Sequence, residues 1–275
     1  MSTDVQQSIS PRPFVKWAGG KRKLIQQYIN YFPKDFKTYY EPFLGGGAVF
    51  FYLHPSSAIL TDINPELVNA YRCVRDNVEE LISLLEEHQL KHCRDYYYQV
   101  RQINCTTRIE KAARLIYLNK TCFNGLYREN SKGEFNVPIG KYKNPKICNR
   151  ALLQSVSVAL QNAQIKVRPF EDILKNANSC DDFVYFDPPY HPLSPTSNFT
   201  AYSRNSFSQD DQIRLKHVFA ELAERGVKVM LSNSDCKFIR ELYSDFKINS
   251  ITASRLINSN GTKRGKISEV LITSY

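Results

Sequence analysis

The sequence predicts an α/β fold in which a mostly parallel sheet carries helices and is interrupted by a helical, turn-rich insertion. Short apolar segments that end at Gly, Asp or Pro alternate with segments of helical pattern along most of the chain. Between about residues 70 and 160 this alternation stops, and the chain is first helical and tyrosine-rich, then rich in turn residues from 130 to 145. Basic residues gather in the same stretch, since residues 91–150 hold thirteen Lys or Arg against four Asp or Glu.

Each element has its own signal in the sequence. The expected strands are short apolar runs, at residues 38–42, 58–61, 164–167, 182–186 and 227–232. The expected helices have apolar residues at helical spacing, at residues 48–53, 65–76, 78–88, 109–119 and 209–225. Ser208 is placed to cap the last of these helices. Residues 246–251 and 270–274 are expected to supply a hairpin-like edge of the sheet.

Composition excludes several classes of protein. A chain with 42% hydrophobic and 23% charged residues has ordinary globular composition. The seven cysteines are odd in number and lack zinc-ligand spacing, which indicates free thiols in a reducing compartment and no metal site. No uncharged apolar run approaches the roughly 18 residues of a membrane span, and the polar start lacks a signal-peptide pattern. We expect a cytoplasmic protein with no membrane partner. Its net charge of +10 fits a polyanionic partner or simply a basic soluble protein.

The strongest motif is Asp187-Pro188-Pro189-Tyr190, directly after the apolar run 183–186. Two prolines here either just end the strand or fix the backbone of a ligand site, because ligands of open α/β sheets bind beyond the carboxyl ends of the strands. The amino group of adenine is a poor nucleophile, since its lone pair is delocalised into the ring. Asp187 and the Pro188 carbonyl, each accepting one N–H, would aim that lone pair at a methyl donor, and the Tyr190 ring can stack on the extruded base.

A glycine motif, Glu41-Pro42-Phe43-Leu44-Gly45-Gly46-Gly47, follows another expected strand. Three glycines let the backbone pass close to a ligand, although a plain strand-to-helix turn has the same pattern. The motif is neither the dinucleotide fingerprint nor a P-loop. Asp62 closes the next strand, where an acidic side chain can accept both hydroxyls of a ribose. The alternative for Asp62 is a helix N-cap, a role that Asn64 can fill instead.

The third motif, residues 14–21, is Phe-Val-Lys-Trp-Ala-Gly-Gly-Lys and holds the only tryptophan. One interpretation is a surface Trp17 before a basic helix start. The other is a Gly-Gly turn that presents a cation beside an aromatic ring. Such a turn can hold a carboxylate, for example the methionine end of S-adenosyl-L-methionine (SAM), with Lys21 as the counter-charge.

Together these motifs, in this order and with a basic insertion before the last, resemble the Dam-type DNA adenine methyltransferases. The similarity covers nearly the whole chain, including residues 124–128, 133–138 and 231–234, and looks closest to the GATC-modifying enzymes of bacterial restriction systems. The resemblance implies a Rossmann-like SAM-dependent methyltransferase fold with a mostly helical target-recognition insertion carrying a hairpin. Residues 1–69 and 161–275 would bind SAM and catalyse, and residues 70–160 would recognise DNA.

The activity implied by the resemblance is transfer of a methyl group from SAM to N6 of adenine in double-stranded DNA by base flipping, within GATC. The product of the donor would be S-adenosyl-L-homocysteine, and no metal is expected. The residues expected to bind the cofactor or the reacting amino group are Trp17, Lys21, Glu41, Phe43, Gly45, Asp62, Phe170 and Asp187, with Pro188 and Tyr190 completing the catalytic motif. Among them, Glu41 is expected at the methionine end and Phe170 on the cofactor adenine.

For DNA recognition the family uses a turn-rich hairpin in the major groove. Arg128 is the natural bidentate reader of a guanine, and Lys16 would read or anchor the first guanine. Phe123 stands where the family often has Tyr, so stacking is retained but a phosphate hydrogen bond is not. The other DNA-binding candidates are Leu126 and Pro138 at a thymine methyl, Asn124, and Lys141, Tyr142, Lys143 and Lys146 as phosphate contacts that position the protein without reading sequence. Each of these last four fits an ordinary solvated surface position equally well.

Two alternatives remain open at the level of sequence. One is a SAM-dependent enzyme that methylates RNA or a protein amide, against which the long basic insertion argues. The other is a DNA-binding module on a decayed methyltransferase body, although no catalytic or cofactor residue is missing. We expect a bacterial-type, nucleoid-associated monomer, linked to a cognate restriction endonuclease only through a shared target sequence.

Overall fold

The computed structural model describes residues 9–193, 207–254 and 266–275, which form two compact units. The first unit consists of Met1–Gly20, Gly45–His54 and Asn64–Val167, and the second of Lys21–Leu44, Pro55–Ile63 and Arg168–Tyr275. This division follows from contacts within the protein and does not show which residues bind DNA. The assignment of residues 70–160 to DNA recognition therefore stays a prediction. The part of the chain that the structure describes contains no helix of the length and apolarity that a membrane crossing requires.

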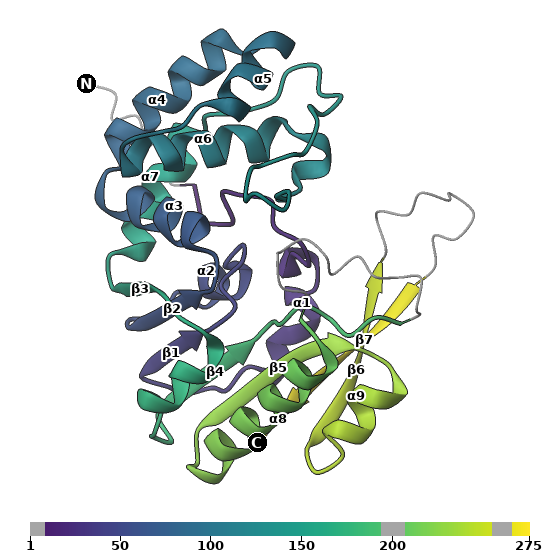
Figure 1. The fold of residues 1–275 in the computed structure, drawn as a ribbon. Coiled ribbons are helices and arrows are strands. Elements are labelled where there is room, and N and C mark those ends of the chain that lie inside the picture. Colours follow the sequence, from purple (N-terminus) through teal and green to yellow (C-terminus); the bar gives the residue numbers. More distant parts are fainter. Residues whose placement is uncertain (1–8, 194–206, 255–265) are drawn as a thin grey trace. The chain divides into compact units, whose positions relative to one another are not determined.

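The described residues build a seven-stranded mixed sheet, and six of its strands belong to the second unit in the order β2-β1-β4-β5-β7-β6 (Figure 1). The bounds of these strands are β1 Thr38–Glu41, β2 Ala58–Asp62, β4 Asp182–Phe186, β5 Lys228–Ser234, β6 Lys247–Ser254 and β7 Lys266–Thr273. Strands β2, β1, β4 and β5 are parallel, and β7 runs antiparallel to both β5 and β6. The predicted hairpin-like edge is therefore confirmed, and β7 starts four residues earlier than expected, at Lys266, because polar Lys266, Ser268 and Glu269 interrupt the apolar run that marked residues 270–274.

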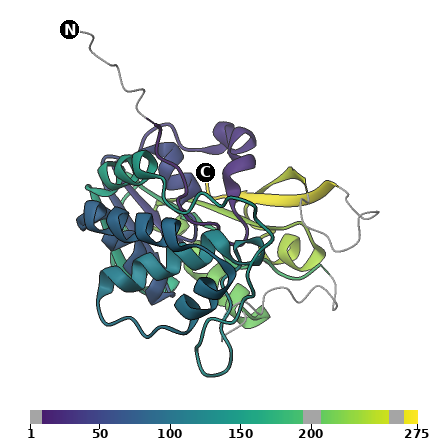
Figure 2. The same ribbon diagram turned by 90° about the horizontal axis from the view of Figure 1, so that it is seen from above.

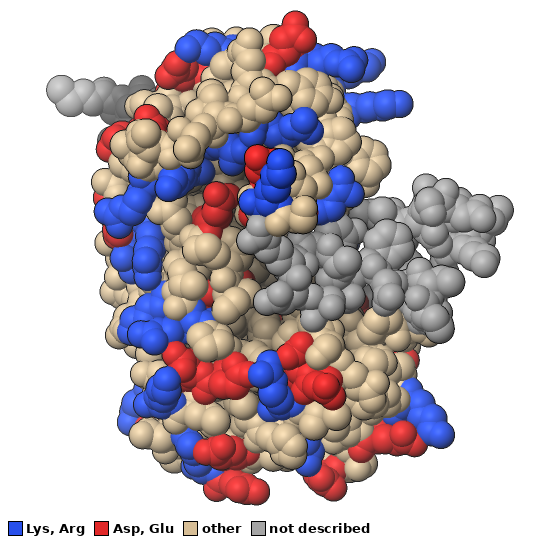
Figure 3. All heavy atoms as spheres, in the orientation of Figure 1, with Lys and Arg blue, Asp and Glu red and all other residues tan. Residues whose placement is uncertain are grey.

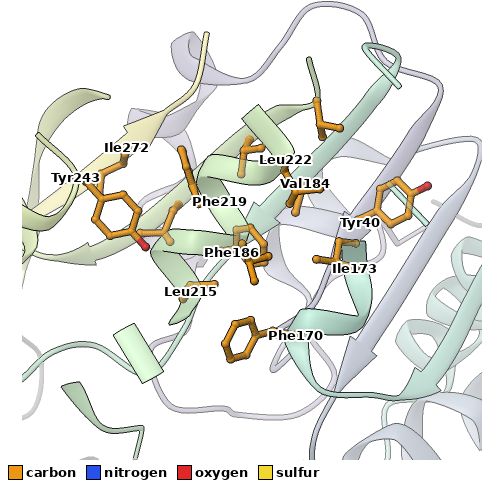
Figure 4. Close-up of a cluster of buried hydrophobic side chains, with 14 of the residues drawn as sticks. Tyr40, Phe170, Ile173, Val184, Phe186, Leu215, Phe219, Leu222, Tyr243 and Ile272 are labelled. Carbon is orange, nitrogen blue, oxygen red and sulfur yellow. The ribbon is translucent and has the colours of Figure 1, made fainter. Parts of the chain in front are cut away.

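The central strand β4 shows why the sheet forms here. All five of its residues, Asp182–Phe186, are buried, as expected for a parallel strand covered on both faces. On one face, Phe186 packs with side chains of α8 (Gln209–Glu224), among them Phe219 and Leu222 (Figure 4). As predicted, Ser208 caps α8, since its side chain accepts a hydrogen bond from the Asp211 N–H.

Short helices complete the second unit. They are α1 Ile25–Tyr28 and α9 Lys237–Leu242, with 3-10 turns at Lys21–Lys23, Ile29–Tyr31 and Phe170–Lys175. Each is too short to show the helical periodicity on which sequence-based prediction depends.

The first unit is mainly helical. Its elements are α2 Ala48–Leu53, α3 Pro65–Asp76, α4 Val78–Lys91, α5 Arg94–Gln102, α6 Arg108–Thr121, α7 Arg150–Leu160 and β3 Ala163–Val167. Helix α6 packs against α3, α4 and α5. These four helices are labelled in Figure 1 and are coloured blue to teal in Figures 1 and 2. The sequence did not predict α5, because only Tyr97 and Val100 of its nine residues are buried.

The predicted hairpin of the insertion is reduced to two isolated antiparallel bridges, Cys122↔Ile139 and Glu129↔Phe135, with the 3-10 turn Phe123–Gly125 beside them. The turn inside the second bridge is stabilised by Asn130, whose side-chain oxygen accepts hydrogen bonds from the N–H groups of Lys132 and Glu134. Backbone hydrogen bonds also join the two sides of the segment, from the Gly140 N–H to the Thr121 carbonyl at the first bridge and from the Asn136 N–H to the Arg128 carbonyl at the second, so it pairs at two points rather than along a continuous ladder.

Candidate active site and DNA interface

Three acidic side chains follow neighbouring parallel strands of the second unit. Strand β1 ends at Glu41, β2 ends at Asp62, and Asp187 comes directly after β4. Because β2, β1 and β4 are adjacent and parallel, their carboxyl ends lie at one edge of the sheet. The second unit therefore gathers the predicted acids at the edge where ligands bind in open α/β sheets.

Asp187 receives two hydrogen-bonding groups on the same oxygen. The Lys21 ammonium lies 2.8 Å from Asp187 Oδ1, and Ser232 Oγ donates to that oxygen, also at 2.8 Å. The lysine side chain is only 4% exposed, whereas Asp187 is 20% exposed. A lysine this buried needs an anionic partner, and Asp187 supplies it. Sequence reasoning did not single out Ser232, although its segment was part of the resemblance.

Tyr190 links the Lys21–Asp187 pair to the C-terminal hairpin. The Lys21 ammonium lies 4.5 Å from the centre of the Tyr190 ring, a cation–π arrangement. The Tyr190 hydroxyl donates to Glu269 Oε2 on β7 at 2.8 Å. Burial raises the pKa of Tyr190 well above its ordinary value, so the hydroxyl keeps its proton. Burial also raises the pKa of Glu269, although the Lys21 charge and the Tyr190 hydrogen bond oppose this. Nothing local in the sequence pointed to Glu269.

The loop of the catalytic motif is fixed by buried amides. Gln212 of α8 donates through Nε2 to the Pro189 carbonyl at 2.9 Å, and Asn233 donates to Gln212 at 3.0 Å. Asn233 Oδ1 also accepts from the His191 N–H at 3.1 Å. These contacts hold the chain on both sides of Tyr190. Within the described residues no hydrogen bond to the Pro188 carbonyl is present, and Pro188 itself is buried.

The other cofactor candidates of the second unit occupy different environments. Glu41 is 2% exposed and accepts a hydrogen bond from the Tyr39 hydroxyl at 2.9 Å. Asp62 is half-buried, and its backbone oxygen accepts from the Arg168 N–H. Phe43 stacks on Phe170, with ring centroids 5.5 Å apart and an interplanar angle of 26°. The second unit thus places acidic groups at the ends of β1 and β2, and packs Phe43, which follows β1, against Phe170 of the 3-10 turn Phe170–Lys175.

Trp17 and Gly45 come together in the first unit. A Cβ on Gly45 would lie 3.0 Å from Trp17 Cδ1, and Gly45 has a φ of +46°, so both sterics and backbone require glycine. The indole also stacks on Tyr127, with ring centroids 5.5 Å apart. Asn64 caps α3 by accepting from the Glu66 and Leu67 N–H groups. This is the capping role that sequence analysis offered as the alternative use of Asp62.

A buried asparagine that sequence reasoning missed organises the Lys16 segment. Asn119 on α6 is 2% exposed, accepts from the Lys16 N–H and donates to the Lys16 carbonyl, both at 2.7 Å. It also donates to the Gly125 carbonyl at 3.1 Å. The Lys16 ammonium lies 3.1 Å from the Tyr142 hydroxyl. Asn119 therefore brings two predicted DNA-binding segments together. Its only signal in the sequence was a polar residue on an apolar helix face.

Most of the predicted DNA readers lie at the surface of the first unit. The exposed candidates are Lys16, Phe123, Asn124, Arg128, Pro138, Lys141, Tyr142, Lys143 and Lys146, and Leu126 is half-buried. Arg128 donates through Nε to Asn136 Oδ1 at 2.7 Å. This contact orients the guanidinium and does not use its two terminal nitrogens. Lys and Arg side chains are numerous over the helices of this unit (Figure 3).

Lys120, at the end of α6, is a further cation in this region. Burial, together with the nearby charges of Lys16 and Arg12, lowers its pKa to about 8. The described residues offer it no anionic partner within ion-pair distance. Lys120 was counted in the basic insertion but was not selected as a DNA contact.

Comparison with known proteins agrees with this arrangement. The family of D12 class N6 adenine-specific DNA methyltransferases matches residues 17–257. The chain is 47% identical to the type II methyltransferase M1.LlaDCHI of Lactococcus lactis subsp. cremoris, over 97% of this chain and 96% of the relative. It is 44% identical to the type II methyltransferase M.MjaIII of Methanocaldococcus jannaschii, over 96% and 99%, and 38% identical to the DNA adenine methylase of Escherichia coli K12, over 94% of each. The chain therefore belongs to the D12 class N6 adenine-specific DNA methyltransferase family.

Proposed function

We propose that this adenine-specific DNA methyltransferase takes its methyl group from SAM and delivers it to an adenine rotated out of duplex DNA, within the sequence GATC. The observation that carries the proposal is Asp187, a partly exposed carboxylate fixed at the carboxyl end of β4 and followed directly by Pro188. Membership of the family favours DNA over RNA or a protein amide as the substrate.

The reaction needs the amino group of adenine to act as a nucleophile. Asp187 and the Pro188 carbonyl, each accepting one N–H, orient the nitrogen lone pair away from the ring plane. Tyr190 offers its ring to the base and is held from behind by Glu269. The nitrogen becomes acidic as the new bond forms, and its proton leaves along the hydrogen bond to Asp187. Rotation of the base out of the duplex is needed because its amino group is otherwise paired.

The residues of the second unit suit the donor. A carboxylate after β2, Asp62, can accept the two ribose hydroxyls, and the aromatic pair Phe43–Phe170 offers an apolar surface to an adenine ring. Glu41 is placed for the ammonium of the methionine end, and Trp17 and Gly45 are the candidates from the first unit. SAM, when bound, supplies a methyl group on a sulfonium sulfur and leaves as S-adenosyl-L-homocysteine. Lys21 is already paired with Asp187, so its use as a counter-charge for the methionine carboxylate requires it to serve both groups.

The GATC target rests on the resemblance to Dam-type enzymes and on the placement of Arg128 and Lys16 at the surface of the first unit. A guanidinium matches the O6 and N7 acceptors of guanine. Incubating the protein with SAM and mixed-sequence duplex DNA, then mapping N6-methyladenine by sequencing, tests donor, base and context together. Methylation confined to another sequence would exclude GATC as the target but would leave the proposed methyl transfer to adenine intact.

The role of Asp187 has its own test. Asp187→Ala is expected to lower the methyl-transfer rate by about 100-fold or more while DNA affinity stays within about threefold, since it removes an acceptor that acts on the reacting nitrogen. Asp181→Ala is the matched control, because among the described cations the Asp181 carboxylate forms an ion pair with the exposed Lys37 alone. Unchanged turnover in Asp187→Ala would exclude Asp187 from the mechanism.

A further inference from the structure

The carboxylate of Asp187 has two oxygens in unequal environments. Oδ1 lies 2.8 Å from the Lys21 ammonium in an ion pair and accepts a hydrogen bond from Ser232 Oγ, also at 2.8 Å. The described residues place no hydrogen-bond donor on Oδ2. A further hydrogen bond continues from Ser232 into the interior, since the hydroxyl oxygens of Tyr185 and Ser232 lie 2.9 Å apart.

From this arrangement we infer that Ser232 and Tyr185 are positioning residues for methyl transfer. Tyr185 donates to Ser232, Ser232 donates to Asp187 Oδ1, and Oδ2 is thereby presented to the amino group of the target adenine. The inference rests on the proposed role of Asp187 and adds the residues that set its orientation.

The register of the sheet explains why these three side chains meet. Phe186 of β4 pairs with Leu231 of β5, so the next step along both strands sets Asp187 beside Ser232. Side chains two residues apart share a face of a strand, so Tyr185 and Asp187 point to the same side. Phe186 and Leu231 point to the opposite side and belong to the apolar core of Figure 4. Parallel pairing of the two strands is therefore sufficient to build the Tyr185–Ser232–Asp187 chain.

The direction of each hydrogen bond follows from the number of protons. A carboxylate paired with a lysine only accepts, so the single hydroxyl proton of Ser232 goes to Asp187. Ser232 then accepts from Tyr185, whose pKa is raised well above its ordinary value by burial and by the charge of Asp187. Both hydroxyls are inaccessible to water, since Tyr185 and Ser232 are each 0% exposed. Water therefore does not replace either hydroxyl in this arrangement.

The consequence for catalysis is geometric. With Ser232 present, two donors from different elements fix Oδ1 and so restrain rotation of the carboxylate about its last bond. Without it, Lys21 alone holds Oδ1, and the carboxylate can turn away from the position in which Oδ2 meets the adenine amino group. A displacement of about 1 Å in a reacting geometry lowers rates by as much as 10²-fold.

The test is a double-mutant cycle on the single-turnover rate of methyl transfer, with saturating radiolabelled SAM and GATC duplex. Ser232→Ala is expected to lower the rate about 10- to 100-fold with KM for DNA and SAM within about threefold. Tyr185→Phe is expected to lower it less, by about 3- to 10-fold, because one hydrogen bond further away is lost. In the Ser232→Ala background, Tyr185→Phe should have no further effect on the rate, since its route to Asp187 is already cut.

Matched controls separate positioning from stability. Ser274→Ala removes a hydroxyl that bonds the backbone of β5 at Val227 and Val229, away from Asp187. Tyr243→Phe removes a buried hydroxyl for which the described residues provide no partner. Both controls should keep the wild-type rate, and thermal unfolding confirms that each variant is folded. Tyr185→Phe keeps the test available if Ser232→Ala does not fold.

Two results overturn the inference. One is a Ser232→Ala enzyme, or a Tyr185→Phe enzyme if the serine variant is unfolded, with the wild-type rate. The other is a double variant whose loss equals the product of the two single losses. If instead Asp187→Ala keeps its activity, the proposed role of Asp187 fails, and this is distinguishable because Asp187→Ala is measured in the same assay.

Discussion

At the scale of single residues, the site combines charges that are costly to bury with partners that stabilise them. Lys21 and Asp187 pair at 2.8 Å, and Glu269 lies beyond Tyr190 with its pKa raised by burial. A second carboxylate in a buried region has an unfavourable charged form, which Lys21 offsets only in part. Glu269 therefore contributes to the pH dependence of stability as well as to the position of Tyr190.

Glu269→Gln is expected to become more stable relative to the wild type as the pH rises from 5 to 8. A carboxyl group whose pKa is higher in the folded than in the unfolded state favours folding below its unfolded pKa, and this contribution is lost as pH rises through the folded pKa. Glutamine retains an acceptor for the Tyr190 hydroxyl but does not ionise. Urea unfolding at several pH values measures the difference.

One further variant and one control accompany the Glu269→Gln measurement. Glu269→Ala removes the acceptor of a buried hydroxyl and should lower the free energy of unfolding by about 1–3 kcal/mol. Glu241→Gln changes an exposed carboxylate on α9 and should show no such trend with pH. A difference between Glu269→Gln and wild type that is constant across this pH range would contradict the prediction.

The residues that sequence reasoning found and missed differ in a physical way. Asp187, Asp62 and Glu41 were predicted because each follows a strand, which is a local pattern. Ser232 bonds Asp187 across a sequence separation of 45 residues, and Glu269 bonds Tyr190 across a separation of 79. Such long-range pairings depend on strand order and register. A single sequence carries no local signal for them.

At the scale of elements, prediction depended on how many side chains an element buries. Every expected strand is present, and β4, which is buried along its whole length, shows the continuous apolar run expected of a parallel strand covered on both faces. Helix α3 was predicted at its observed bounds because Asn64 and Pro65 mark its start and six of its residues are buried. The expected hairpin of the insertion is present as two isolated antiparallel bridges rather than as strands, with backbone hydrogen bonds across each bridge and a turn capped by Asn130.

Helix α6 carries a prediction about pH. Lys120 has a pKa of about 8, below its ordinary value because of burial and two neighbouring cations. A DNA phosphate beside it would stabilise the charged form, so binding above pH 8 takes up a proton. We expect DNA affinity to fall as pH rises from 7 to 9, by at most about tenfold per pH unit. Lys120→Arg should reduce this fall, because a guanidinium stays charged. Fluorescence anisotropy with labelled duplex measures it.

The control for Lys120→Arg is Lys143→Arg, which makes the same change at an exposed position. Its affinity should follow the wild-type pH dependence. Equal pH slopes for wild type and Lys120→Arg would show that Lys120 does not face DNA.

At the scale of the whole molecule, charge is distributed according to task. The chain carries a net charge of +10, and residues 91–150 hold thirteen Lys or Arg against four acids. The acids of the active site lie instead in the second unit, at the ends of β1, β2 and β4. Such a division suits an enzyme whose polyanionic substrate and reacting base need different surroundings. It also separates two kinds of contact that experiments can distinguish, those that read bases and those that neutralise phosphates.

Arg128→Ala and Lys143→Ala are expected to fail in different ways. Each phosphate neutralised by the protein contributes a slope of about −0.9 to the dependence of log affinity on log salt. Lys143 is an exposed lysine of the turn-rich segment, so Lys143→Ala should weaken binding to all duplexes alike and make the slope shallower by about 0.9. Arg128 is oriented by its hydrogen bond to Asn136, so Arg128→Ala should instead weaken the free energy of binding to GATC duplex by about 1–3 kcal/mol and change binding to other sequences little.

Anisotropy titrations of both variants at four salt concentrations, with GATC and scrambled duplexes, measure slope and specificity together. Lys37→Ala, at a lysine paired with Asp181, is the control and should leave both quantities unchanged. An equal loss on both duplexes for Arg128→Ala would make Arg128 a phosphate contact and leave the reading of guanine to other residues.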